Sequence, residues 1–96
     1  MSEKKGLLVN NSFSFAIRII NLYKFLTTEK REFVLSKQIL RSGTSIGALI
    51  REAQNAESKP DFIHKLGIAQ KECDETSYWL ELLYETEYIN KDLFDS

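Results

Sequence analysis

The chain has 96 residues and a formal net charge of −1, which is enough for one domain with a single core and excludes a uniformly basic nucleic-acid binder. No apolar run approaches the roughly 18 residues that cross a membrane, and the N-terminus lacks a signal-peptide pattern. A single cysteine cannot form an internal disulfide, so we expect a reducing, cytoplasmic location.

The chain begins with residues 1–11, which show no hydrophobic periodicity and are predicted to form a flexible N-terminal tail. Asn11 or Ser12 can cap the first helix of a single helical-bundle domain over residues 12–96. That helix carries two adjacent apolar rows and therefore touches more than one neighbour. The rows are Phe13, Ala16, Ile20, Tyr23 and Thr27, and Phe15, Ile19, Leu22 and Leu26.

The second predicted helix spans residues 32–56 and follows a polar turn at residues 27–32. Thr28 followed by Glu29 is typical of a helix start, because a carboxylate there meets the positive end of the helix dipole. The core row recurs at steps of three and four residues, which is the spacing of a helix packed lengthwise on another helix. That row is Leu35, Ile39, Ser42, Ile46, Leu49, Ala53 and Ala56.

Gly43 and Gly47 lie four residues apart on a second row of this helix. Each glycine costs about 0.8–1.0 kcal/mol relative to alanine inside a helix, so we expect another helix backbone to approach closely here. The alternative is a helix break at residues 41–43. Both rows keep their phase across the glycines, which favours a continuous helix.

The third predicted helix spans residues 60–88 and would be roughly 44 Å long. Ser58 fits the N-cap, Pro60 is tolerated in the first turn, and Asp61 completes a pair that resembles a capping box. Its core row is Phe62, Leu66, Ala69, Cys73, Thr76, Leu80 and Leu83. On this row Cys73 is predicted to be a small buried hydrophobe.

A mixed polar row lies beside that core row, and it either faces solvent or meets Arg41 and Arg51 of the second helix. We expect Arg41 to lie within about 4 Å of Glu72 or Glu75, and a buried pair of this kind would make Arg41→Ala cost roughly 3–5 kcal/mol. The predicted structural polar network consists of Arg41, Glu52, Lys65, Glu72 and Glu75.

The fold class predicted by these rows is all-α, an antiparallel up-down helical bundle. It has three long helices and a short fourth helix, for which Asn90 is a candidate cap. The apolar rows exceed what a three-helix monomer can hide, so we expect a homo-oligomer.

Charge is distributed unevenly along the chain. Residues 1–31 carry six basic and two acidic side chains, whereas residues 57–96 carry four basic and ten acidic ones. Opposite charges in one small chain more often neutralise one another, between helices or subunits, than recruit nucleic acid. A symmetric assembly would nevertheless gather a candidate nucleic-acid patch from Arg18, Lys24, Lys30 and Arg31.

The sequence contains no pattern that supports catalytic chemistry. Cys73 and His64 are nine residues apart on one helix, on opposite faces, so they cannot pair within one subunit. One histidine is too few for a di-iron helical bundle, and no phosphate-binding glycine loop is present. Pairing of Glu72 and Glu75 with arginine is favoured over acid–base work. We predict no enzyme activity, cofactor, metal or small-molecule substrate.

Two runs carry a family resemblance. They are residues 40–48 with Glu52 and Ala53, and residues 61–69 with Lys71, Glu72, Glu75, Thr76, Tyr78, Trp79 and Leu80. Together they resemble the four-helix-bundle family of 23S rRNA intervening-sequence proteins, often labelled S23 ribosomal proteins. Leu49 departs from the family, which usually has asparagine there, so a polar contact of that motif is missing.

The resemblance implies an up-down bundle that forms homo-oligomers, commonly pentamers. The chain is also similar to the accessory variability proteins of diversity-generating retroelements, which bind a reverse transcriptase and nucleic acid. The sequence therefore favours a non-enzymatic oligomeric scaffold, and the alternative is an accessory protein that binds RNA or DNA.

Overall fold

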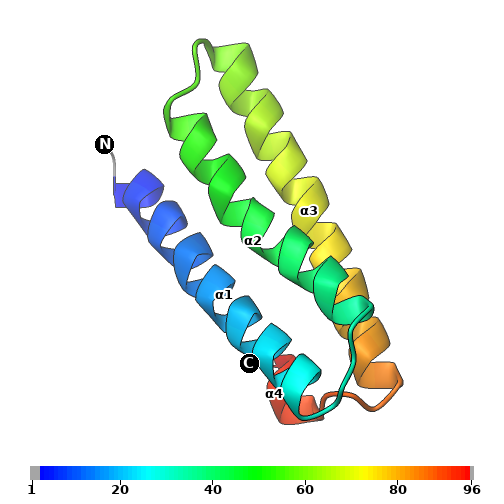
Figure 1. The fold of residues 1–96 in the computed structure, drawn as a ribbon. Coiled ribbons are helices and arrows are strands. Elements are labelled where there is room, and N and C mark those ends of the chain that lie inside the picture. Colours follow the sequence, from blue (N-terminus) through cyan, green and yellow to red (C-terminus); the bar gives the residue numbers. More distant parts are fainter. Residues whose placement is uncertain (1–2, 96) are drawn as a thin grey trace.

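The computed structural model describes residues 3–95, which form four helices joined by short connections (Figure 1). The helices are α1 (Glu3–Thr28), α2 (Leu35–Gln54), α3 (Lys59–Glu85) and α4 (Lys91–Asp95). Helices α1 and α3 run in one direction and α2 runs in the other. The predicted up-down bundle, with three long helices and a short fourth, is therefore confirmed.

Helix α1 begins at Glu3, so the predicted start at Asn11 or Ser12 is wrong and the helix crosses the predicted boundary between tail and domain. Ser12 is buried, and its hydroxyl donates to the carbonyl of Val9 at 3.0 Å, as a mid-helix serine does. Val9 packs against buried side chains of α2 and α3, which gives this end of α1 a tertiary partner. Residues 1–2 of the predicted tail lie outside the described residues.

Helix α2 begins at Leu35, three residues later than predicted. The pair Thr28–Glu29 does not start it, because Thr28 closes α1 with its hydroxyl donating to the carbonyl of Lys24 at 2.6 Å. Glu32 takes over this role: its carboxylate accepts from the backbone N–H of Leu35 at 3.0 Å and from the N–H of Ser36 at 2.7 Å. A side chain three or four residues upstream thus satisfies donors that have no intrahelical partner.

Helix α3 starts where the sequence predicts. Ser58 is its N-cap and accepts from the backbone N–H of Asp61 at 3.2 Å. The helix ends at Glu85, three residues earlier than predicted. Glu87 then adopts a left-handed backbone with φ of 67°, and Tyr88 N–H donates to a carbonyl one turn back, which reverses the chain toward α4.

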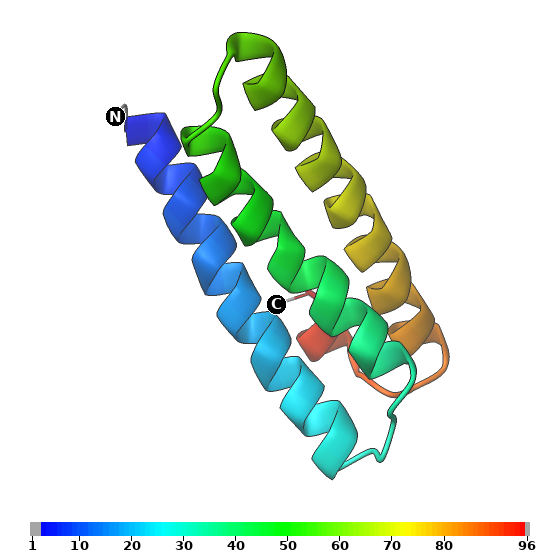
Figure 2. The same ribbon diagram turned by 45° about the horizontal axis from the view of Figure 1, so that its top comes forward.

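Helix α2 is central, because both α1 and α3 pack on it and make no backbone contact with each other (Figure 2). The main core lies toward the α4 end of the bundle. Its buried members are Ile19 and Leu26 of α1, Ile39 of α2, Leu83 of α3 and Ile89. A second cluster of Ile46, Ile50 and Ala69 lies toward the other end. This arrangement leaves a groove between α1 and α3, which α4 covers at one end.

Cys73 is exposed, so its predicted burial is wrong. It lies seven residues before Leu80, on the same side of α3, and Leu80 lines the groove between α1 and α3. The five-residue α4 is too short to cover the whole groove. The core row of α3 is therefore buried where it meets α2 and open where it meets the groove.

Candidate interaction surfaces

A polar network joins α2 and α3 at the surface. Nη1 of Arg41 is 3.1 Å from Oε2 of Glu72, and Nη2 of Arg41 contacts Oε2 of Glu75. The indole N–H of Trp79 donates to the same Glu75 carboxylate at 3.1 Å. One guanidinium thus holds two carboxylates that lie one helical turn apart, a geometry suited to the forked donors of arginine.

A hydrogen bond lies beneath this network, in the α2–α3 interface. The hydroxyl of Thr76 is 2.8 Å from that of Ser42, and both side chains are buried. Thr76 also reaches the carbonyl of Glu72 at 2.8 Å, so neither hydroxyl is buried without a partner. Ser42 and Thr76 lie on the core rows of the second and third predicted helices, but a bond between them was not predicted from the sequence. Two hydroxyls on facing core rows were the signal that could have indicated it.

The five residues of the predicted polar network form two separate groups. Arg41, Glu72 and Glu75 make one group, and Lys65 pairs with Glu52 at 3.3 Å in the other, nearer the start of α3. Arg51 does not contribute to either group. Its guanidinium lies 5.1 Å from the ring centroid of Phe13, and it therefore links α2 to α1.

Arg41→Ala is expected to lower the free energy of unfolding by only about 0.5–1 kcal/mol. The Arg41 side chain is 52% exposed, so water screens both ion pairs and the larger cost of a buried pair does not apply. Urea unfolding of Arg41→Ala, Glu72→Gln and the double variant would measure the coupling. Lys37→Ala is the control, because no ion pair formed among residues 3–95 uses Lys37. A loss above about 2 kcal/mol would show that the pair is desolvated.

The predicted close-packing glycines face α1. A Cβ on Gly43 would lie 2.7 Å from Cγ1 and 2.9 Å from Cγ2 of Ile19, which is closer than real Cβ atoms approach. A Cβ on Gly47 would lie 3.4 Å from the carbonyl oxygen of Ser12, an ordinary contact. Gly43 therefore determines how closely α1 and α2 pack.

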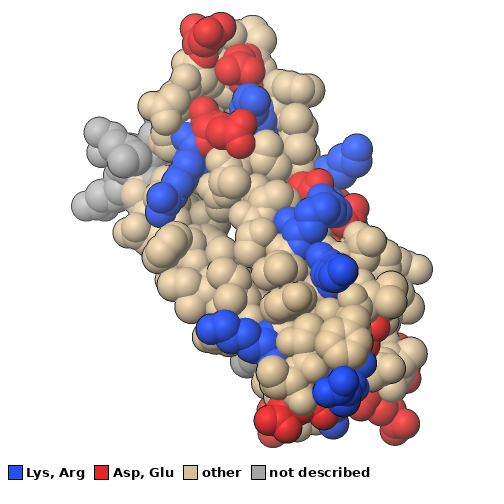
Figure 3. All heavy atoms as spheres, in the orientation of Figure 1, with Lys and Arg blue, Asp and Glu red and all other residues tan. Residues whose placement is uncertain are grey.

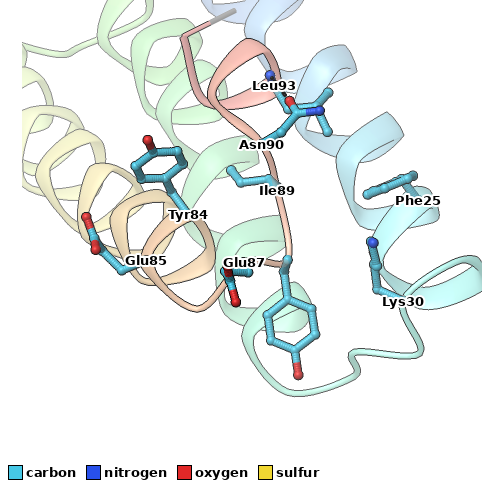
Figure 4. Close-up of a pocket in the computed structure, with 9 residues that line it drawn as sticks. Phe25, Lys30, Tyr84, Glu85, Glu87, Ile89, Asn90 and Leu93 are labelled. Atoms are coloured by element: carbon cyan, nitrogen blue, oxygen red, sulfur yellow. Dashed lines mark hydrogen bonds between the residues drawn. The ribbon is translucent and has the colours of Figure 1, made fainter.

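An apolar pocket of about 470 Å³ opens in the groove between α1 and α3. Phe15 and Leu22 of α1 and Leu80 of α3 contribute to its walls, Phe94 of α4 closes one end, and Arg18 adds a cation. A second pocket of about 500 Å³ lies at the α4 end of the bundle and is more polar (Figure 4). Its lining residues are Phe25, Lys30, Tyr84, Glu85, Glu87, Tyr88, Ile89, Asn90 and Leu93.

The four residues of the predicted nucleic-acid patch do not gather within one chain. Arg18 lines the apolar pocket, and Lys24, six residues along α1, lies on another face. Lys30 sits 5.8 Å from the ring of Phe25, and Arg31 lies 5.6 Å from the ring of a neighbouring phenylalanine. Basic and acidic side chains both occur on the face shown in Figure 3, where no large area is basic alone. None of the four joins an ion pair formed among residues 3–95.

The described residues hold no cluster of three His, Cys, Asp or Glu side chains that could bind a metal ion. His64 and Cys73 are both exposed on α3 and lie on opposite faces of it. In the part of the chain that the structure describes, no helix is long and apolar enough to cross a membrane.

The structure is thus a small up-down helical bundle. Close packing at Gly43 joins α1 to α2, and the ion pairs of Arg41 join α2 to α3. The family model of the 23S rRNA-intervening sequence protein matches residues 4–96, so the chain belongs to that family and the resemblance is confirmed. A crystal structure of a protein with unknown function, from the S23 ribosomal protein family of Bacteroides thetaiotaomicron VPI-5482, is 61% identical with a TM-score of 0.95. The match covers 96% of this chain and 82% of that one. No protein with a curated description matches this chain.

Proposed function

We propose that this chain is a non-enzymatic, homo-oligomeric helical scaffold. The observation that carries the proposal is an apolar face on α1, where Phe13 is 52% exposed and Ile17 and Ile20 on the same face are also exposed. Large apolar side chains scattered singly need no explanation, but a contiguous row on a small domain is typical of a protein interface. The free Cys73 supports a reducing, cytoplasmic location.

Size-exclusion chromatography with light scattering at micromolar concentration tests this proposal. We expect a mass that is a multiple of the 11.1 kDa chain, and a pentamer is the state that the family resemblance implies. A monomer across the micromolar range would contradict the proposal.

A second candidate function is binding of structured RNA or DNA as an accessory protein. The observation that favours it is the set of four cations on α1 and the loop after it, which make no ion pair among residues 3–95. A cyclic assembly would repeat these cations around one axis. Their summed field would attract a polyanion even though one chain is close to neutral.

Filter binding to a structured RNA tests the second function. Binding should weaken steeply with salt, because phosphate contacts release counterions. Replacing Arg18, Lys30 and Arg31 with glutamine should lower both the affinity and its salt dependence. The matched control replaces Lys37, Lys59 and Lys71 with glutamine, which changes the net charge equally. Absence of retention at low salt would contradict nucleic-acid binding.

A further inference from the structure

We infer that the apolar face of α1 packs against the outer face of α3 in a second copy of this chain, in a head-to-tail contact. This inference rests on the proposed oligomeric function and assigns its surfaces. The α1 face consists of Phe13, Ile17, Ile20 and Lys24. The α3 face consists of Ile63, Gly67, Gln70, Asp74, Tyr78 and Glu81.

Both faces point away from the chain's own core. Residues two apart on a helix lie about 200° apart around its axis, nearly opposite. Phe13 precedes Phe15 of the groove by two residues, and Ile20 precedes Leu22 in the same way. The α3 face is likewise opposite the side of α3 that packs on the rest of the chain. The residues that follow Ile63, Gly67, Asp74 and Glu81 by two positions are buried or bonded to α2. They are Lys65, Ala69, Thr76 and Leu83.

The α3 face carries apolar side chains that the single chain leaves in water. Ile63 is exposed, and Tyr78 is 55% exposed although its ring meets the edge of Trp79 at a centroid distance of 5.2 Å. Each face therefore gains burial of apolar surface when it meets the other. A contact between two α1 faces would bury only one of these two surfaces.

Gly67 is the second indication that α3 has a partner. Glycine disfavours the helix interior, and this glycine is the ninth of the 27 residues of α3. A Cβ added to Gly67 would meet nothing within 4 Å, whereas one added to Gly43 or Gly47 would meet α1. The two glycines of α2 are thus explained by a neighbouring helix in the same chain. The space above Gly67 admits the backbone or a large side chain of a helix from another copy.

Charge favours α1 as that helix. Lys24 ends the α1 face, and Asp74 and Glu81 lie on the α3 face. Within residues 3–95 none of these three joins an ion pair, and Asp74 accepts a hydrogen bond from Gln70 at 3.2 Å. A head-to-tail contact brings a lysine toward carboxylates, which selects this pairing over one between two acidic α3 faces.

The two faces lie at the same height in the bundle. Ser12 of α1 lies beside Gly47 of α2. Gly47 is midway between Glu52, which pairs with Lys65 of α3, and Ser42, which is hydrogen-bonded to Thr76 of α3. Phe13 is therefore about level with Gln70. Because α1 and α3 rise in the same direction by the same amount per residue, Lys24 is about level with Glu81.

Equal heights determine the type of assembly. A head-to-tail contact without a shift along the helices repeats around an axis parallel to them, and it closes into a ring where a whole number of copies completes the turn. A contact between faces at different heights would shift each added copy along the helix direction, and the copies would build a filament. We therefore expect a species of finite mass that does not grow with concentration.

The first test replaces Gly67 with leucine in the full chain. The added side chain has room in the single chain, so helix content by circular dichroism should be unchanged, while the dissociation constant of the oligomer should rise about tenfold or more. Ala48→Leu is the matched control, because Ala48 is exposed on α2, and α2 belongs to neither face. Analytical ultracentrifugation over a dilution series measures both variants.

The second test exchanges charges. Lys24→Glu and Glu81→Lys should each weaken assembly about tenfold, most strongly at low salt. The double variant should restore assembly to near that of the unaltered chain, because each interface then pairs a glutamate with a lysine again.

The outcomes separate the inference from the proposed function. A monomeric unaltered chain would overturn both. An oligomer that tolerates Gly67→Leu as well as it tolerates Ala48→Leu would overturn the interface alone. Single charge variants that weaken assembly without rescue by the double variant would also overturn it, and so would a mass that rises without limit with concentration.

Discussion

Leu83→Ala is expected to lower the free energy of unfolding by about 2–5 kcal/mol, the usual cost of removing a large side chain from a packed core. Leu83 is 0% exposed and belongs to the cluster that includes Leu26 of α1 and Ile39 of α2. The truncation would leave a cavity where three helices meet, and none of the three can close it without moving away from another. For a domain of this size such a loss is a large share of the total stability.

Chemical denaturation followed by circular dichroism measures the effect. Leu7→Ala is the matched control, because it removes the same atoms from a side chain that is 61% exposed, and we expect a change below about 0.5 kcal/mol. All variants should be compared at one protein concentration, since assembly adds to apparent stability. Similar losses for Leu83→Ala and Leu7→Ala would contradict the position of the core.

The type and order of the helices could be predicted from the sequence because the apolar rows keep a helical period. The ends of the helices were harder. The helical start at Glu3 carries no periodic signal, and residues there are held by packing of Val9 on the second core cluster. Glu32 caps α2 from three residues upstream, whereas the sequence pattern indicated the earlier pair Thr28–Glu29.

Surface features could be predicted where their residues lie close together in the sequence, and not where they depend on how several helices pack. Two carboxylates one turn apart on α3 are visible in the sequence, and the structure has Arg41 beside both of them. The exposure of Cys73 was not visible, because periodicity cannot tell which half of a core row a short α4 leaves uncovered. The equal height of Phe13 and Gln70 depends on the register of two interhelical contacts through α2, which the sequence does not encode as a motif.

Gly43→Leu is expected to destabilise the chain by about 2–3 kcal/mol, although leucine is the better helix former by almost 1 kcal/mol. The Cβ of the new leucine would already lie within 3 Å of two side-chain atoms of Ile19. Ile19 is β-branched and buried, and both of these atoms lie close to the α1 backbone. Ile19 has no exposed end to swing away, so relief requires that α1 and α2 separate.

The graded series Gly43→Ala and Gly47→Ala isolates the close approach from helix propensity. Both changes bring the same propensity gain, and only the first places a Cβ inside 3 Å of a neighbour. Gly47→Ala should therefore be neutral or stabilising by up to about 1 kcal/mol, whereas Gly43→Ala should be less stable than Gly47→Ala and Gly43→Leu the least stable of the three. If the variants at Gly43 unfold at the same denaturant concentration as Gly47→Ala, then α1 is not held against α2 at this residue.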